Sequence, residues 1–183
     1  MTFLTWITSH SMTIKIGKNV YIAPTAVILG DVEISDGVSV FDSAVIRGDM
    51  NTIWIGQDSN VQDNVTIHTD SGNPTAIGKN VSIGHNAVVH GATVDDNVII
   101  GMASVILNGA HIRSGTVVAA GSVVKENFES HENSLLAGIP AEEKRISDSL
   151  LEYAIANGRS YQAIRDRYLA GGVDRISGEM RSS

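Results

Sequence analysis

Aliphatic residues recur every six positions along most of this 183-residue chain. The period is interrupted three times: three residues are added after Asp49, four are added after His68, and one is missing after His90. The seventeen anchor positions are Ile16, Ile22, Ile28, Ile34, Val40, Ile46, Ile55, Val61, Ile67, Ile77, Ile83, Val89, Val94, Ile100, Ile106, Ile112 and Val118. Glycine, Asn or Asp often lies between anchors, as is typical of tight corners.

The six-residue period predicts an all-β solenoid. One unit of six fits a short strand and a corner, and three such sides close one coil of a triangular prism. A single coil cannot bury its own anchors, so stacked coils build the core. Seventeen sides predict between five and six coils. The 21 Ile and 19 Val against 8 Leu support strands, because β-branched side chains suit a pleated surface.

The pattern changes after Val124, where helical spacing replaces the repeat. Ser147 predicts the start of a helix, whereas Gly158 and Ser160 predict an interruption, so we expect one bent or broken C-terminal α-helix along a prism face. The predicted order is an N-terminal extension (1–13), the solenoid domain (14–124), a connector (125–146), a C-terminal helical segment (147–172) and a flexible tail (173–183).

Composition and charge exclude several functions. The chain has no cysteine, so any metal site must use histidine and carboxylate ligands. Residues 1–141 carry 6 Lys and Arg against 13 Asp and Glu, which argues against nucleic-acid binding. No apolar run approaches the roughly 18–20 residues that span a bilayer, and the N-terminus lacks the charged start of a secretory signal. We therefore predict a cytoplasmic protein with no nucleic-acid or membrane partner.

Two of the six histidines occupy equivalent positions one coil apart. His68 follows anchor Ile67 and His90 follows anchor Val89, so both side chains should point outward on the same face. Neighbouring strands lie about 4.8 Å apart, and two imidazoles at that spacing can bind one zinc ion at roughly 2.0–2.1 Å. For His10, His111 and His131 we expect only surface positions.

His85 lies two places after anchor Ile83, five residues before His90. At about 3.3 Å per residue, it is roughly 15 Å from His90, too far to share a metal within one protomer. Either His85 is unrelated to the pair, or the metal lies at a subunit interface and His85 comes from a neighbour. A three-fold assembly allows the second arrangement, so we predict a homotrimer with one metal at each interface.

The segments Gln62–His68 and Gly84–Gly91, together with Arg47-Gly48-Asp49, resemble the gamma-class carbonic anhydrases in their short-loop, hexapeptide-repeat branch. The resemblance implies a left-handed parallel β-helix. It also implies that His68, His85 and His90 bind zinc or iron(II) between protomers of a trimer. The implied activity is reversible hydration of CO2 to bicarbonate by a metal-bound hydroxide at the trimer interfaces.

Further residues match this family. Arg47 lies one coil before His68, and Asp63 one coil before His85; the resemblance implies an inter-subunit ion-pair network of Arg47, Asp49 and Asp63. It also gives Gln62 the role of a hydrogen-bond partner for the metal-bound water or bicarbonate. Tyr161 resembles a helix tyrosine that reaches toward the site, although a core position fits it equally well.

One departure from the family leaves other functions open. The most active members carry an acidic proton-shuttle loop, whereas here Met50 follows Asp49 and Asp70 is the only acid in the insertion after His68. Slow turnover is therefore expected. A second hypothesis is a hexapeptide-repeat acyl-CoA thioesterase or acyltransferase, because Gly138-Ile139-Pro140-Ala141 resembles the exit segment of those enzymes. A third is a non-catalytic metal-binding trimer.

Overall fold

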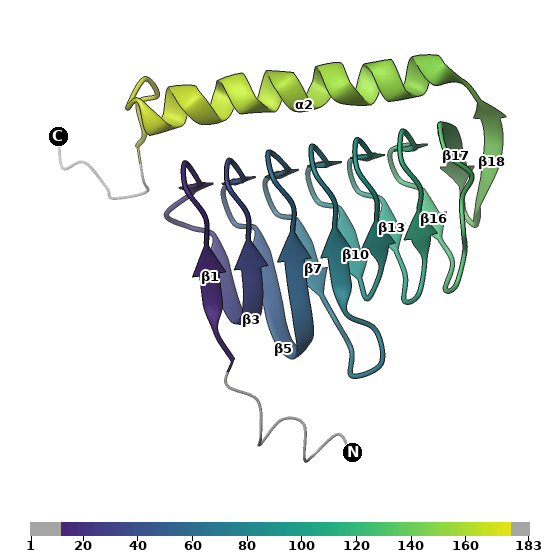
Figure 1. Ribbon diagram of the computed structural model, residues 1–183, viewed down its shortest axis with the longest axis horizontal. Helices are drawn as coiled ribbons and strands as arrows, with labels where there is room; N and C mark the ends of the chain where they lie inside the picture. The colour runs from purple at the N-terminus through teal and green to yellow at the C-terminus, as the bar shows by residue number, and fades with distance from the viewer. Residues whose placement is uncertain (1–11, 177–183) are drawn as a thin grey trace, which may run out of the picture.

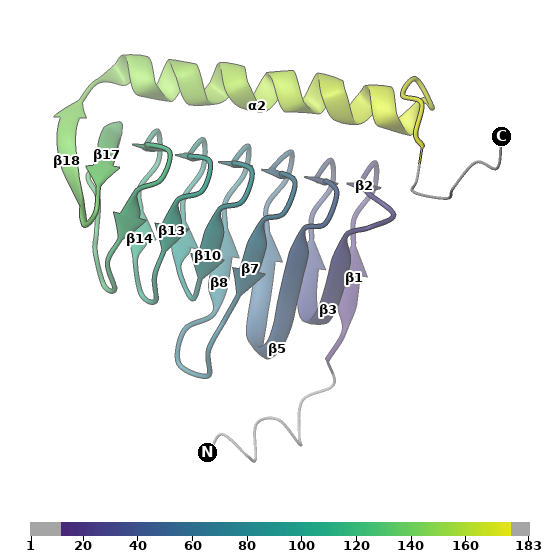
Figure 2. The ribbon, with the colours of Figure 1, turned by 180° about the vertical axis from the view of Figure 1, so that it is seen from behind.

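The computed structural model, which describes residues 12–176, is a parallel β-solenoid with one long helix along its side (Figures 1 and 2). Predictions for residues 1–11 and 177–183, including the surface position of His10, lie outside the described residues. Within the described part, no helix is long and apolar enough to cross a membrane.

Short strands stack into the three faces of a triangular prism. The first face contains β3 (Val27–Ile34), β5 (Val45–Ile55), β7 (Thr66–His68), β10 (Val88–His90), β13 (Val105–Ile106) and β16 (Val123–Val124). The second contains β1 (Ile14–Ile16), the later halves of β3 and β5, β8 (Thr75–Ile77), β11 (Thr93–Val94) and β14 (His111–Ile112). The third contains β2 (Tyr21–Ile22), β4 (Ser39–Val40), β6 (Asn60–Val61), β9 (Ser82–Ile83), β12 (Ile99–Ile100), β15 (Val117–Val118) and β17 (Ser134–Gly138).

The predicted anchors form the core. Each pairs with the anchor one coil away, as in Ile46 with Ile67 and Ile67 with Val89. Most are fully buried, including Ile67 and Ile106 at 0% exposure. Corners between the strands repeatedly adopt positive φ at Asn or Gly, residues that tolerate this conformation. The six-residue period therefore arises because one side chain on each side of the prism is buried in its core.

The solenoid is longer than the sequence pattern indicates. The third face has seven stacked parallel strands within the described residues, so the prism has about seven coils rather than five to six. The next two anchor positions after Val124 are Ser130, which is 4% exposed, and Leu136, which is fully buried. The Ser130 hydroxyl accepts a hydrogen bond from the Arg113 backbone N–H at 2.8 Å. A polar residue in an anchor position thus hides the last coil from a search for aliphatic periodicity.

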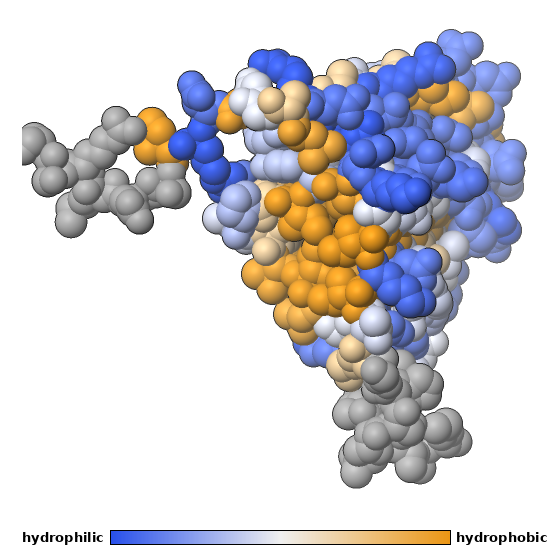
Figure 3. All heavy atoms as spheres, turned by 60° about the vertical axis from the view of Figure 1, so that its left-hand side comes forward, coloured by the Kyte–Doolittle hydropathy of each residue, from blue (hydrophilic) through white to orange (hydrophobic). Residues whose placement is uncertain are grey.

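The segment predicted as a connector closes the end of the prism. Its strand β17 pairs with β15, and β18 (Ala141–Ile146) turns back antiparallel to β17. At the opposite end, among residues 12–176, no earlier coil covers the first strands, and Ile14, Ile16 and Val27 are 43–50% exposed. Figure 3 shows apolar surface gathered at this end of the molecule.

The C-terminal helix α2 (Asp148–Leu169) is continuous, so the predicted interruption near Gly158 is wrong. Ser147 is the N-cap, as predicted, and its side chain accepts a hydrogen bond from the Ser149 N–H. The Ser160 hydroxyl donates to the Ala156 carbonyl inside the helix at 3.1 Å instead of capping a second segment. Gly158 is needed for close packing: a Cβ atom there would lie 2.0 Å from Asn80 Oδ1.

Polar contacts attach α2 to successive coils along the third face. The buried Arg165 guanidinium donates to the Gly37 carbonyl at 2.5 Å and pairs with Asp58 at 2.8 Å. Gln162 donates to Asn80 Oδ1 at 3.1 Å. The helix therefore runs back along the prism toward the first coil, as Figure 1 shows.

Gly158→Ala should destabilise the protein by about 1 kcal/mol, because the clash with Asn80 outweighs the gain in helix propensity. In an Asn80→Gly background, which removes the clash and suits the positive φ at this corner, the same change should stabilise by a few tenths of a kcal/mol or more. Denaturant unfolding at one protein concentration measures both. A stabilising effect of Gly158→Ala in the unmodified chain would contradict this packing.

Candidate functional site

Three predicted site residues form one outward column on the first face, the Arg47–His68–His90 ladder. Arg47 pairs with His68, and His68 with His90, in the parallel register of β5, β7 and β10. The alignment follows from the anchors, because each of these residues directly follows a buried aliphatic side chain. Stacking of the two histidines, predicted from the repeat alone, is confirmed.

The two imidazole rings of the ladder meet edge-on, with one nitrogen of each ring in contact. His68 Nδ1 lies 2.9 Å from His90 Nε2, and the rings are tilted by 68°. A tetrahedral metal with bonds of 2.0–2.1 Å needs two ligand nitrogens roughly 3.3 Å apart. A few tenths of an ångström therefore separate this geometry from that of a shared metal, so the pair fits two positions of such a site.

Asp49 contacts Nε2 of His68, the ring nitrogen that is not in contact with His90. Its Oδ1 lies 3.1 Å from His68 Nε2, and its Oδ2 accepts from the Arg47 guanidinium at 2.7 Å. Burial opposes ionisation of Asp49, but these hydrogen bonds hold its pKa below its usual range. Burial lowers the pKa of His68, and the charges of Arg47 and His90 lower it further. The hydrogen bond to Asp49 raises it, but the net shift is downward. The arrangement favours a neutral imidazole, the form that binds metals.

His85 and Asp63 form a second pair, apart from the ladder. Their side chains meet at 2.8 Å, one coil apart as the repeat frame predicts. Across residues 12–176, no group of three histidine or carboxylate side chains lies close enough to hold a metal ion. One chain thus supplies His68 and His90 together, and His85 elsewhere. Within the chain Arg47 pairs with Asp49 rather than with Asp63.

Gln62 and Tyr161 lie with His85 in a groove between α2 and the third face. The groove has a volume of about 300 Å³, and apolar residues of β12 and β15 line most of its floor. Gln62 is 5% exposed; its Oε1 accepts from the His85 backbone N–H at 3.2 Å, and its Nε2 donates to Asn60. The structure therefore brings three predicted site residues together that are far apart in the sequence.

Tyr161 both packs against the core and borders the groove, the two positions that the sequence left open. Its ring packs edge-on against Phe41, with centroids 5.9 Å apart, and it also lines the groove. Burial raises the pKa of Tyr161, and the negative charge of Asp63 raises it further. The phenol therefore stays protonated at neutral pH and can donate a hydrogen bond into the groove.

Asn108 is a site residue that the sequence analysis missed. Its Oδ1 lies 2.5 Å from His90 Nδ1, and its Nδ2 donates to Asp70 Oδ2 at 2.5 Å. The dipeptide Asn108-Gly109 is typical of a turn, which hides any further role of the side chain. The only available signal was position: Asn108 lies in the next coil, one residue after the position equivalent to His90.

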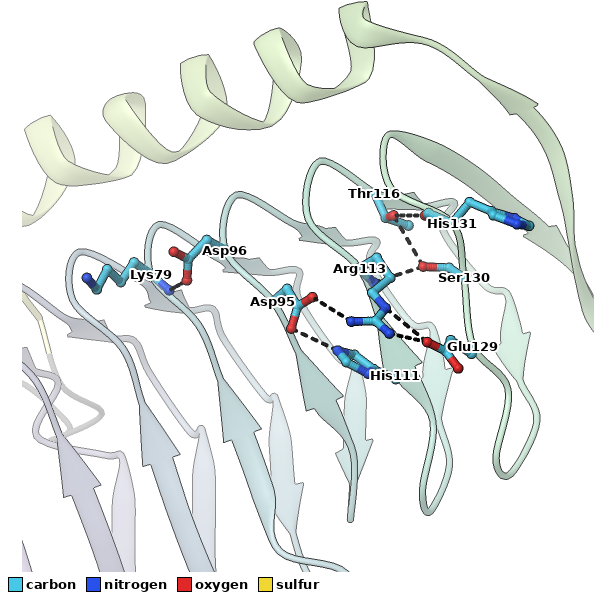
Figure 4. A network of polar contacts seen from close by, with 9 residues as sticks. All are labelled: Lys79, Asp95, Asp96, His111, Arg113, Thr116, Glu129, Ser130 and His131. Atoms are coloured by element: carbon cyan, nitrogen blue, oxygen red, sulfur yellow. Dashed lines mark hydrogen bonds and ion pairs between the residues drawn. The ribbon is translucent and has the colours of Figure 1, made fainter.

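The remaining described histidines make separate contacts, in agreement with the surface positions predicted for them. His111 pairs with Asp95 at 2.8 Å on the second face, within a line of polar side chains that includes Arg113 and Glu129 (Figure 4). His131 pairs with Glu143 at 2.8 Å near the last coil.

The fold and its sequence period define the class as hexapeptide-repeat β-solenoid proteins. The hexapeptide repeat of succinyl-transferase matches residues 74–107 and 92–126. A solved structure of a hexapeptide transferase family protein from Anaplasma phagocytophilum superposes with a TM-score of 0.82 at 32% identity, covering 86% of this chain and 93% of that one.

Sequence comparison identifies the family within this class. The chain is 47% identical to a probable carbonic anhydrase from Methanocaldococcus jannaschii, over 75% of this chain and 92% of the relative. It is 37% identical to gamma carbonic anhydrase 2, mitochondrial, of Arabidopsis thaliana, over 80% of this chain and 55% of the relative. The chain thus spans little more than half the length of the plant protein. It belongs to the gamma carbonic anhydrase family, as its resemblance predicted.

Proposed function

We propose that this protein is a metal-dependent enzyme that hydrates CO2 reversibly to bicarbonate. The observation that carries the proposal is the facing pair His68 Nδ1 and His90 Nε2, 2.9 Å apart on an outward ladder. Asp49 accepts from the opposite nitrogen of His68, which leaves Nδ1 with its lone pair toward His90. Two such nitrogens repel each other unless a proton or a cation lies between them.

The donor set fits zinc or iron(II). Imidazole suits both metals, and the ligating histidine has a carboxylate partner on its other nitrogen, as is usual in metal sites. A divalent cation held by three histidines would lower the pKa of a bound water to about 7, which would supply a nucleophile for CO2 at neutral pH. His68, His90 and His85 are the residues that would hold it.

The third ligand requires a second protomer. His85 carries its ring away from the ladder, against Asp63, and remains 39% exposed at its side chain. Three-fold association of parallel prisms would bring this corner of the partner subunit to the ladder. We therefore propose a homotrimer with one zinc or iron(II) site at each interface, in which Arg47, Asp49 and Asp63 also connect neighbouring subunits.

The groove residues would position the substrate. Gln62 is nearly buried and fixed by Asn60, so its amide has one orientation toward the His85 side of the groove. Tyr161 keeps its proton at neutral pH and can donate a hydrogen bond to a bicarbonate oxygen. Arg47 contributes positive charge that attracts an anion to the ladder, although Asp49 neutralises part of it.

Stopped-flow CO2 hydration tests the proposal directly. Protein loaded with zinc or, under anaerobic conditions, with iron(II) should hydrate CO2 above the buffer rate, and His90→Ala should lose this activity. His131→Ala is the control, since His131 is an exposed histidine with its own carboxylate partner. Absence of activity in both metal-loaded forms would overturn the proposal. Because no acidic shuttle loop is present, we expect the rate to rise with buffer concentration.

His85→Ala should remove metal from every interface, because each site needs one His85 from a neighbouring subunit. His111→Ala is a matched control: His111 also pairs with an aspartate at 2.8 Å but lies on the second face. Metal content per subunit after gel filtration measures the effect. Full occupancy in His85→Ala would contradict the shared site.

Arg47→Ala should weaken the trimer at least tenfold, since loss of one partner leaves a carboxylate unpaired at the interface. Sedimentation equilibrium measures the association constant. Arg113→Ala serves as the comparison, because Arg113 has similar side-chain exposure and is ion-paired to Glu129. An association constant equal to that of the unmodified protein would rule out an interface role for Arg47.

The groove supports a second candidate function, that of an acyl-CoA thioesterase or acyltransferase. Its 300 Å³ and mostly apolar floor exceed what CO2 requires, and His85 at its edge is a potential general base. Turnover of acyl-CoA that persists after metal removal would favour this function. A trimer without turnover on either substrate would indicate a structural role.

A further inference from the structure

We propose that Asn108, oriented by Asp70, is a positioning residue that fixes the protonation tautomer of His90. Neither residue belongs to the ligand set proposed above. The inference concerns how one ligand is prepared for its metal, and it therefore rests on the proposed function. A chain of hydrogen bonds runs inward from Asp70 through Asn108 to His90.

Asp70 presents only acceptor oxygens to Asn108. Its Oδ1 accepts from the backbone N–H groups of Gly72 and Asn73, both at 2.8 Å, and from the Asn73 side chain at 3.0 Å. These contacts anchor the carboxylate within the insertion that follows His68. Its Oδ2 is then directed at the Asn108 amide.

The carboxylate determines which way the Asn108 amide points. The Asn108 atom 2.5 Å from Asp70 Oδ2 must be the nitrogen, because two oxygens at that distance with no hydrogen between them would repel. The amide oxygen therefore faces His90. Since this oxygen only accepts, His90 Nδ1 must carry the proton and donate it across the 2.5 Å contact.

Proton placement on Nδ1 leaves the other ring nitrogen free. In neutral His90, Nε2 then has a lone pair, and this nitrogen faces His68 Nδ1. Asp49 has the corresponding effect on His68. The two outer contacts thus leave these two nitrogens for a metal; without a metal, a proton between them relieves their repulsion at 2.9 Å, and metal binding displaces that proton.

Gly91 makes room for this arrangement. A Cβ atom at Gly91 would lie 2.6 Å from Asn108 Oδ1 and 2.8 Å from Asn73 Cβ, and its φ of +57° also disfavours other residues. Gly91 is located where the repeat loses one residue, directly after His90. Asn108 thus lies against both the shortened corner, through Gly91, and the insertion after His68, through Asp70.

The tautomer can be measured without metal. Two-bond ¹H–¹⁵N correlation spectra of the metal-free protein at pH 8 distinguish the two neutral tautomers, and His90→Ala assigns the signals. We expect a protonated Nδ1 for His90 in the unmodified protein and a shift to protonated Nε2 in Asn108→Leu. An unmodified protein in which Nδ1 of His90 carries no proton would overturn the inference, whatever its metal affinity.

A reversed pair tests the mechanism of orientation. In Asp70→Asn/Asn108→Asp, the amide and the carboxylate exchange places, so position 108 again accepts from His90 Nδ1 and position 70 donates. This double variant should restore the Nδ1 tautomer that Asn108→Leu loses. Glu126→Leu, at the equivalent exposed corner one coil later, is the control and should leave His90 unchanged. Failure of the reversed pair, with a folded protein by thermal melting, would count against the inference.

Cobalt(II) affinity, measured by competition with a chelator, links the tautomer to the proposed site. Asn108→Leu should bind cobalt(II) 10–100-fold more weakly, the usual cost of losing an outer hydrogen bond to a ligating histidine. The reversed pair should recover most of this loss, and its cobalt absorption spectrum should match that of the unmodified protein. An unmodified protein that binds no metal would refute the proposed function, while the tautomer spectra would still decide the role of Asn108.

Discussion

Parallel stacking of one aliphatic anchor upon the next is the constraint on which the rest of the molecule depends. Each coil is held to its neighbours by backbone hydrogen bonds and by fully buried side chains such as Ile46, Ile67 and Ile106. Because the anchors are in register, every position beside an anchor is also in register. A column of outward side chains can therefore be arranged as closely as adjacent strands allow.

The breaks in the repeat position the side chains of the proposed metal site on this regular frame. The added residues after His68 provide Asp70, and the missing residue after His90 leaves Gly91 at a close approach to Asn108. The extension after Asp49 lets β5 continue across a corner, so that Asp49 lies beside both Arg47 and His68. A strictly periodic chain would stack two histidines but would not orient either of them.

The C-terminal helix adds the other half of the proposed site. It returns along the third face and is attached by Arg165 and by the close packing of Gly158 on Asn80. This attachment places Tyr161 over Gln62 and His85, which come from the middle of the solenoid. The ladder and this groove lie on different sides of one corner, which is why the proposed site needs a second subunit.

The sequence by itself determined the prism and the outward ladder, because a six-residue period has few structural solutions and fixes the direction of every side chain beside an anchor. It determined the family through the segments Gln62–His68 and Gly84–Gly91. It did not determine the last coil, where Ser130 replaces an aliphatic anchor and is satisfied by the Arg113 backbone. Nor did it determine the unbroken helix or the contact of Asn108 with His90. Local propensity predicts a helix break at Gly158 and only a turn at Asn108. Only the tertiary structure brings Asn80 and His90 against these residues, and those long-range contacts decide what each one does.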